Sequence, residues 1–153
     1  MVNDLPHGAA LRKGRYSALG QIYLITAVTY NRAPLLENFQ MAQCAIYALR
    51  STTVVERVDT LAYVLMPDHL HWLFQLKEGD LSRVVQRVKS KSAFEINRYQ
   101  GANGQIWQRG FHDRALRKED DVKKVARYIV ANPLRAGLVE SIGDYPFWDA
   151  IWL

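Results

Sequence analysis

Two apolar runs in the middle of the chain are separated by only two residues, Pro67 and Asp68. Residues 59–66 and residues 69–76 each have the length and the side-chain composition of a β-strand, and a Pro-Asp pair is typical of a tight turn. The two runs therefore predict a β-hairpin, so the fold must contain a sheet.

The other apolar patterns place this hairpin in an α+β fold. Before the hairpin they predict a strand at 21–30 and a helix at 39–50. After the hairpin they predict a helix that Asp80 or Ser82 caps and that ends near Tyr99, and then a strand at 106–116. A last helix is predicted from about 119–121 through Asn132. The order β-α-β-β-α-β-α matches the ferredoxin-like, or RRM-like, antiparallel sheet with two helices on one face. The last helix is then available to cover the other face.

The length of the chain favours one domain. With 153 residues, 49% of them apolar, it can bury one core, and no repeat or linker divides it, so we predict a single domain over residues 1–153. The single cysteine, Cys44, cannot form an intramolecular disulfide. No apolar run approaches the roughly 20 residues of a membrane helix, and the start lacks a secretory signal. We therefore expect a cytoplasmic protein without a membrane partner.

A histidine pair begins the second strand of the predicted hairpin. His69 and His71 are two residues apart, so both point to the same side of a strand, while Leu70, Trp72 and Phe74 point to the other side. Two imidazoles supply part of the coordination shell of a divalent metal, which would still need a third ligand and open positions for substrate oxygens. The alternative is two unrelated surface or hydrogen-bonded histidines.

A tyrosine lies off the apolar face of the last predicted helix. The apolar stripe consists of Val122, Val125, Ala126, Ile129 and Val130. At about 100° per residue, Tyr128 falls roughly 130° from the centre of this stripe, so it is not a core residue of the helix. Asn132 follows one turn later on nearly the same side. The alternatives are a Tyr128 that packs against the sheet and an Asn132 that caps the next turn, with Pro133 at the first position of that turn.

With these residues named, the chain resembles the REP-associated tyrosine transposases. The resemblance is carried by four segments, in this order: AYVLMPDHLHWLF, LSRVVQRVKSKSAFEIN, GQIWQRGFHDRAL and ARYIVANPLRAGLVESIGDYPFW. It runs from about Arg12 to Trp148, and its most specific parts are His-Leu-His after Met-Pro-Asp and the Tyr-Ile-x-x-Asn-Pro-Leu-Arg-Ala-Gly-Leu run. These transposases belong to the single-tyrosine branch of the HUH endonucleases, in which two histidines flank a hydrophobic residue on a strand.

The resemblance implies a function and a site. His69 and His71 would bind a divalent metal, Tyr128 would be the nucleophile, and Asn132 would be the third metal ligand, where single-tyrosine relatives often have Gln. The family cleaves and rejoins single-stranded DNA at hairpins of repetitive extragenic palindromes through a 5′-phosphotyrosine. Because a free tyrosine has a pKa of about 10, a metal that polarises the scissile phosphate would assist the attack. We expect Mg²⁺ or Mn²⁺, with stronger support from Mn²⁺, which accepts imidazole more readily.

Basic side chains supply candidates for DNA binding. The net charge is +5, and residues 81–127 hold twelve basic and five acidic side chains. The candidates are Arg83, Arg87, Lys91 and Arg98, which form one stripe on a helix; Arg109, His112, Arg114 and Arg135; and Arg12, Lys13 and Arg15 of a basic arm within residues 1–18. The alternatives are a solvated surface for the stripe, a structural role for His112 and a helix cap for Arg135. We expect Trp107 and Phe111 in the core rather than stacked on bases.

Two other functions remain open at this point. A non-catalytic module that binds hairpin DNA or RNA would keep its affinity after chelation and after Tyr128→Phe. A small metal-dependent hydrolase that uses water as the nucleophile would need His69 and not Tyr128. The transposase ranks first because the tyrosine, the histidines and the predicted topology agree independently. We expect a monomer, with a dimer as the alternative.

Overall fold

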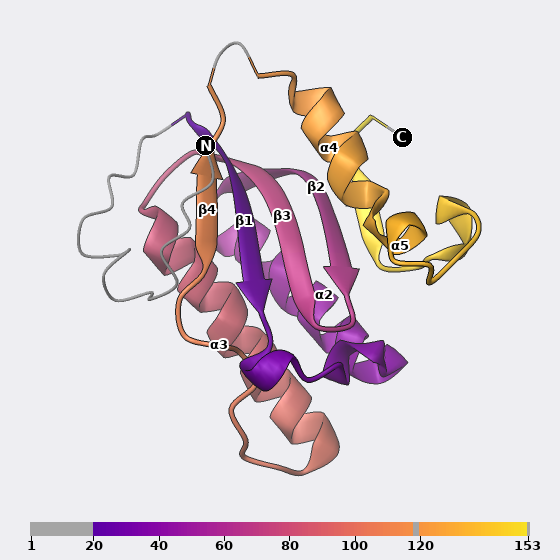
Figure 1. Ribbon diagram of the computed structural model, residues 1–153. Helices are drawn as coiled ribbons and strands as arrows, with labels where there is room; N and C mark the ends of the chain where they lie inside the picture. Colours follow the sequence, from indigo (N-terminus) through magenta and orange to yellow (C-terminus); the bar gives the residue numbers. More distant parts are fainter. Residues whose placement is uncertain (1–19, 118–119, 153) are drawn as a thin grey trace.

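A five-stranded antiparallel sheet organises the part of the chain that the computed structural model describes, residues 20–117 and 120–152 (Figure 1). The strands lie in the order β4-β1-β3-β2-β5. They are β1 (Ile22–Val28), β2 (Val58–Met66), β3 (His69–Leu76), β4 (His112–Ala115) and β5 (Trp148–Ala150). The order of the first four strands is the ferredoxin-like order, so the predicted fold class is confirmed. The edge strand β5 was not predicted.

Two long helices cover one face of the sheet, behind the strands in Figure 1. They are α2 (Phe39–Val55), which is longer than predicted, and α3 (Leu81–Gln100). The side chain of Asp80 caps α3 by accepting a hydrogen bond from the Arg83 N–H, and Gly101 ends the helix in the left-handed conformation, at φ 65°. Between these helices and the sheet lies the larger apolar core, in which Trp72 and Phe74 are fully buried.

The opposite face carries two shorter helices on the side of β2, α4 (Val122–Val130) and α5 (Asn132–Arg135) (Figure 1). Ala126 and Ile129 of α4 belong to a second apolar cluster with Val64, Met66 and Leu73 of the sheet. The face of β3 that bears Leu73 also bears the two histidines, because these residues alternate with the buried Trp72. Helix α4 therefore packs on the histidine face, the face that was expected to be available to the last helix.

The predicted strand at 106–116 is shorter in the structure, where β4 covers only His112–Ala115. Trp107 makes an isolated bridge to Thr29, and Gly110, at φ 77°, bends the chain between this bridge and β4. The ammonium group of Lys89 donates hydrogen bonds to the carbonyl oxygens of Gln108 and Gly110, at 2.7 Å each. These contacts hold the segment as a loop beside α3. Trp107 and Phe111 are buried in the core, as expected.

The last predicted helix also ends earlier than predicted. Helix α4 stops at Val130, Ala131 is its C-cap, and α5 begins at Asn132. The cause is Pro133, which has no N–H to continue the hydrogen-bond ladder of α4 and lies instead in the first turn of α5.

Three single-turn 3-10 helices complete the described elements: η1 (Tyr30–Arg32), η2 (Leu35–Glu37) and η3 (Ile142–Asp144). The segment before β5 is tied to the sheet by Tyr145, whose hydroxyl donates to the Leu65 carbonyl oxygen at 2.6 Å. Burial of this phenol raises the pKa of Tyr145 to about 12. None of the described helices is long and apolar enough to span a membrane.

Candidate active site

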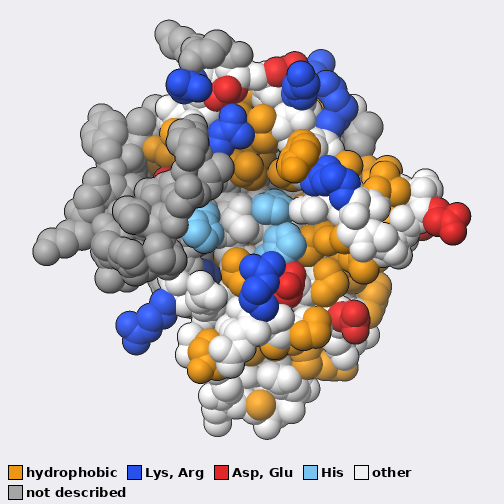
Figure 2. All heavy atoms as spheres, in the orientation of Figure 1, with side chains coloured by type: hydrophobic (Ala, Val, Ile, Leu, Met, Phe, Trp, Pro, Cys, Tyr) orange, Lys and Arg blue, Asp and Glu red, His pale blue; other side chains and the backbone are white. Residues whose placement is uncertain are grey.

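The two histidines of β3 lie side by side on the face of the sheet that α4 partly covers. The ring centroids of His69 and His71 are 4.7 Å apart, and the rings are inclined by 77°. Figure 2 shows the described histidines near the centre of this face, with basic side chains around them. The strand thus brings the pair together in the arrangement that the alternation of residues 69–76 predicted.

Each histidine is held through its Nδ1 atom. His69 Nδ1 lies 2.7 Å from Asp68 Oδ1, and His71 Nδ1 lies 2.8 Å from Thr26 Oγ1. These contacts orient both rings and leave both Nε2 atoms for another ligand. Neither Asp68 nor Thr26 was singled out from the sequence. Asp68 could have been found from its place directly before His69, whereas Thr26 lies opposite His71 only through the β1–β3 register.

The surroundings shift two pKa values in this cluster. Burial, followed by the charges of His69 and Arg135, lowers the pKa of His71 from 6.5 to about 4. Burial alone would raise the pKa of Asp68, but the hydrogen bond from His69 and the charges of His69 and Arg32 outweigh it, and the net pKa is lowered. At neutral pH the imidazole of His71 is therefore neutral, the form that ligates metals.

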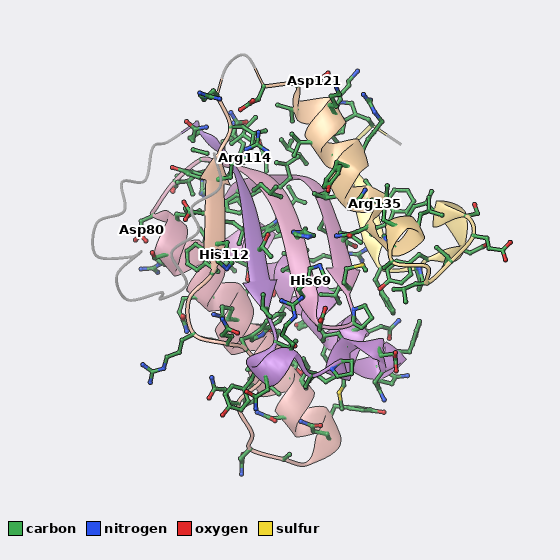
Figure 3. All side chains as sticks on the ribbon, viewed as in Figure 1. His69, Asp80, His112, Arg114, Asp121 and Arg135 are labelled. Atoms are coloured by element: carbon green, nitrogen blue, oxygen red, sulfur yellow. The ribbon has the colours of Figure 1, made fainter. Side chains whose placement is uncertain are left out.

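The tyrosine of α4 is exposed on a helix that packs on the histidine face of the sheet. Tyr128 is 65% exposed, whereas its neighbours Ile129 and Val130 are buried, so the prediction that it lies off the core face is confirmed. The guanidinium carbon of Arg135 lies 3.8 Å from the centroid of the Tyr128 ring. Figure 3 shows Arg135 near the junction of α4 and α5, on the same side of the sheet as His69. The charge of Arg135 also lowers the pKa of His71, so this arginine contacts the Tyr128 ring and lies within electrostatic range of that histidine.

The donor set of the histidine pair fits a divalent metal only in part. Among residues 20–117 and 120–152, no three His, Cys, Asp or Glu side chains come together as metal ligands. His69 and His71 have the hydrogen-bonded Nδ1 atoms typical of ligating imidazoles. Asn132 is half-buried at the start of α5, where Ala131 is the N-cap and no side chain caps the helix. The residues fit a metal that takes two imidazoles and completes its shell with amide, water or phosphate oxygens.

Three further candidates lie along the β4 side of the molecule. His112 is directly opposite Thr26, which is in turn opposite His71, so the three form one row across the sheet. Arg114 lies on β4, with its terminal nitrogen 3.6 Å from an Asp120 carboxylate oxygen. Arg109 was predicted on the fourth strand, but it is exposed in the loop before β4.

The basic stripe of α3 lies on the helical side of the molecule, away from the histidines. Arg83 and Arg87 both pair with the buried Glu56, and Lys91 and Arg98 both pair with Glu95. Three of these four basic side chains line a groove of about 570 Å³ between α2 and α3, namely Arg83, Arg87 and Lys91. The structure therefore does not bring the stripe together with the histidine pair. Arg12, Lys13 and Arg15 lie outside the described residues.

Comparison with known proteins assigns the family. The model of the family described as IS200-like transposase matches residues 18–132. The chain therefore belongs to the IS200-like transposase family.

Within this family the chain is similar to REP-associated tyrosine transposases, so the resemblance seen in the motifs is confirmed. The protein of that name from Escherichia coli K12 is 29% identical over 135 residues, which are 87% of this chain and 78% of that protein. A Haemophilus influenzae protein that carries the same family name is 32% identical over 100 residues, 58% of this chain. The matched region spans 57% of the length of that relative.

Two solved structures have the same fold. One is a REP-associated tyrosine transposase bound to a REP hairpin, with a TM-score of 0.73 and 28% identity, covering 88% of this chain and 79% of that chain. The other is a Deinococcus radiodurans protein described as a transposase, with a TM-score of 0.55 and 19% identity, covering 76% of this chain and 93% of that chain. At that identity the second structure supports the fold alone.

Proposed function

We propose that this chain is a metal-dependent single-stranded DNA endonuclease of the HUH class that cleaves and rejoins DNA at REP-type hairpins. The observation that carries the proposal is the exposed Tyr128, in contact with Arg135, on the helix that packs on the same face of the sheet as a pair of oriented histidines. The substrate class is supported by the hairpin-bound relative, whose fold covers most of this chain. The fold alone would not support this substrate class, because proteins of this fold have many unrelated functions.

Covalent catalysis by tyrosine accounts for both cleavage and rejoining. Tyr128 Oη forms a bond to phosphorus while the bond between phosphorus and the 3′ oxygen breaks. The phenol proton leaves to solvent, and the released 3′ oxygen takes up a proton. The product is a 5′-phosphotyrosine and a free 3′-hydroxyl, and the reverse attack by a 3′-hydroxyl reseals the strand without a nucleotide cofactor.

The side chains around Tyr128 have distinct roles in this reaction. His69, His71 and Asn132 would hold Mg²⁺ or Mn²⁺, which when bound supplies a charge that polarises the scissile phosphate. Asp68 and Thr26 keep the two imidazoles in place. Arg135 orders the exposed phenol ring and places a positive charge where the phosphate gains negative charge.

The decisive experiment looks for a covalent protein–DNA adduct. End-labelled single-stranded REP-type hairpins are incubated with the protein and Mn²⁺, with and without chelator, and separated on a denaturing gel. We expect a labelled band at the mass of the protein that disappears with chelator and in Tyr128→Phe. Tyr99→Phe is the matched control, because Tyr99 is also an exposed helical tyrosine, near the end of α3. It keeps the adduct.

Two outcomes would replace the proposal with one of its alternatives. Tight hairpin binding without any adduct, across several REP-type sequences, favours a non-catalytic binding module. Metal-dependent cleavage that survives Tyr128→Phe and is lost in His69→Ala favours a hydrolase that uses water as the nucleophile.

A further inference from the structure

The chain leaves β1 through a strained turn. Asn31 and Arg32, both in η1, have positive φ angles of 55° and 51°. The left-handed region favours glycine, and asparagine tolerates it through its short polar side chain, but arginine has no such compensation. A non-glycine residue held in this conformation points to a constraint from its surroundings or from function.

Buried hydrogen bonds from a neighbouring residue fix this turn. Thr29 is fully buried, and its hydroxyl lies 2.8 Å from the Ala33 carbonyl oxygen and 3.1 Å from the Asp68 carbonyl oxygen. The Thr29 N–H also donates to the Asp68 carbonyl oxygen, and the Tyr30 N–H donates to the Ile106 carbonyl oxygen. The turn is therefore attached to the segment that carries the histidines.

The turn places Arg32 next to the histidine pair. Val28 at the end of β1 is opposite His69, so the chain enters the turn beside that histidine. Arg32 Nε lies 3.3 Å from Asp68 Oδ2, while the other carboxylate oxygen of Asp68 contacts His69. One carboxylate thus separates the guanidinium group from a candidate metal ligand.

The ion pair does not explain why an arginine occupies this position. The side chain of Arg32 is 60% exposed, and an exposed ion pair adds little to stability. The contact with Asp68 uses Nε, and a guanidinium group has terminal N–H donors that match the oxygens of a phosphate. We propose that Arg32 binds a phosphate of the DNA strand that lies across the histidine pair. This assignment rests on the proposed function and adds a strand contact to it.

The chain contains a matched arginine for the test. Arg57 also has a positive φ, 55°, and its Nη1 forms an exposed ion pair with Glu78 at 3.4 Å. It precedes Val58, which pairs with Leu76 at the opposite end of the hairpin from His69. Glycine accepts positive φ at either position, so Arg32→Gly and Arg57→Gly both relieve strain and remove one charge. They differ in distance from the histidines.

The experiment measures binding of a fluorescein-labelled REP-type hairpin with a single-stranded extension, by anisotropy over a range of salt concentrations with chelator present. We expect Arg32→Gly to weaken binding roughly ten-fold relative to wild type, as for one charge-assisted contact. The slope of log affinity against log salt falls by about 0.7, the value for one phosphate of a single strand. Arg57→Gly keeps both the affinity and the slope. Both variants melt no lower than wild type, and Arg32→Lys retains the slope.

The outcomes separate this inference from the proposed function. If wild type binds the hairpin and Arg32→Gly matches Arg57→Gly in affinity and slope, the assignment of Arg32 is wrong while the proposed function stands. If wild type does not bind REP-type hairpins, the proposed substrate is wrong and the phosphate contact is wrong with it.

Discussion

Burial of His71 keeps its imidazole in the neutral form. Its imidazole lies on the central strand β3, next to His69 and within reach of the charge of Arg135. Burial and these charges penalise the protonated ring, which lowers the pKa of His71 to about 4. A protonated imidazole cannot ligate a metal. The low pKa therefore keeps the His71 ring in the neutral form, which can ligate a metal, well below neutral pH.

The lowered pKa of His71 predicts a dependence of stability on pH. In the unfolded chain the imidazole takes up its proton near pH 6.5, whereas in the folded protein it does so near pH 4. The stabilisation is present above pH 6.5 and is lost as the pH falls toward 4, because the unfolded state binds more protons in this window. We expect the free energy of unfolding to fall by about 2 kcal/mol from this residue between pH 7 and pH 5.

Urea unfolding with chelator at several pH values measures this loss. The control is His71→Gln, which keeps a polar side chain at the position but does not titrate. Parallel pH profiles for wild type and His71→Gln would show that the pKa of His71 is not lowered by folding.

The residues that could be predicted from the sequence are those whose role follows from local spacing. The common face of His69 and His71 follows from strand alternation, and the exposure of Tyr128 follows from helical periodicity. The support of His71 by Thr26 could not be predicted, because these residues are 45 positions apart and meet only through strand register. The backbone strain at Arg32 was likewise invisible, because arginine is not a residue that favours positive φ.

The position of Tyr128, the proposed nucleophile, depends on a short helix. Helix α4 has nine residues, and an isolated helix of that length is marginal in water. It is stabilised by its N-cap Asp121, whose carboxylate accepts from the Lys124 N–H at 3.1 Å, and by packing of Ala126 and Ile129 on the sheet. The position of Tyr128 therefore depends on contacts outside its own turn.

Removal of this cap should affect activity more than removal of an equivalent cap elsewhere. Asp121 and Asp80 are both aspartate N-caps, of α4 and α3 respectively (Figure 3). We expect Asp121→Ala and Asp80→Ala each to cost about 1 kcal/mol of stability. Only Asp121→Ala slows formation of the Tyr128 adduct and speeds hydrogen exchange of the α4 amides. Equal adduct rates in the two variants would contradict the dependence of Tyr128 on the α4 cap.

The helices and strands that could be predicted are those that neighbouring residues in the sequence specify. The hairpin and α3 lie within one residue of their predicted bounds, because alternation, a turn and a cap specify them. Strand β5 was missed because it is three residues long and pairs with β2 from the far end of the chain. The predicted strand at 106–116 was too long because Gly110 and Lys89 hold a loop where the sequence has strand-like residues.

The basic stripe of α3 and the histidine pair lie on opposite sides of the sheet. The histidines and Tyr128 belong to the face that carries α4, whereas the basic stripe belongs to α3 on the other side. The stripe is partly neutralised by Glu56 and Glu95. A contact between the stripe and DNA would therefore involve a part of the hairpin remote from the cleaved strand.

Substitution of the stripe tests this division. We expect Lys91→Gln combined with Arg98→Gln to weaken binding of the hairpin and to lower its salt slope by about 1.8, the value for two duplex phosphates. Binding of the single-stranded extension without the stem is unchanged. Anisotropy titrations with both probes measure the difference. Equal losses for the two probes would show that the stripe does not bind the stem.

Both edges of the sheet are formed by short strands. Strand β4 has four residues and β5 has three, while the long strands β1, β2 and β3 are paired on both sides. Unpaired strand edges are templates on which other chains add strands and aggregate, and short edges offer few hydrogen-bonding groups for this. In the part of the chain that the structure describes, the long strands thus lie inside the sheet, and its short edges offer other copies of the chain little on which to add a strand.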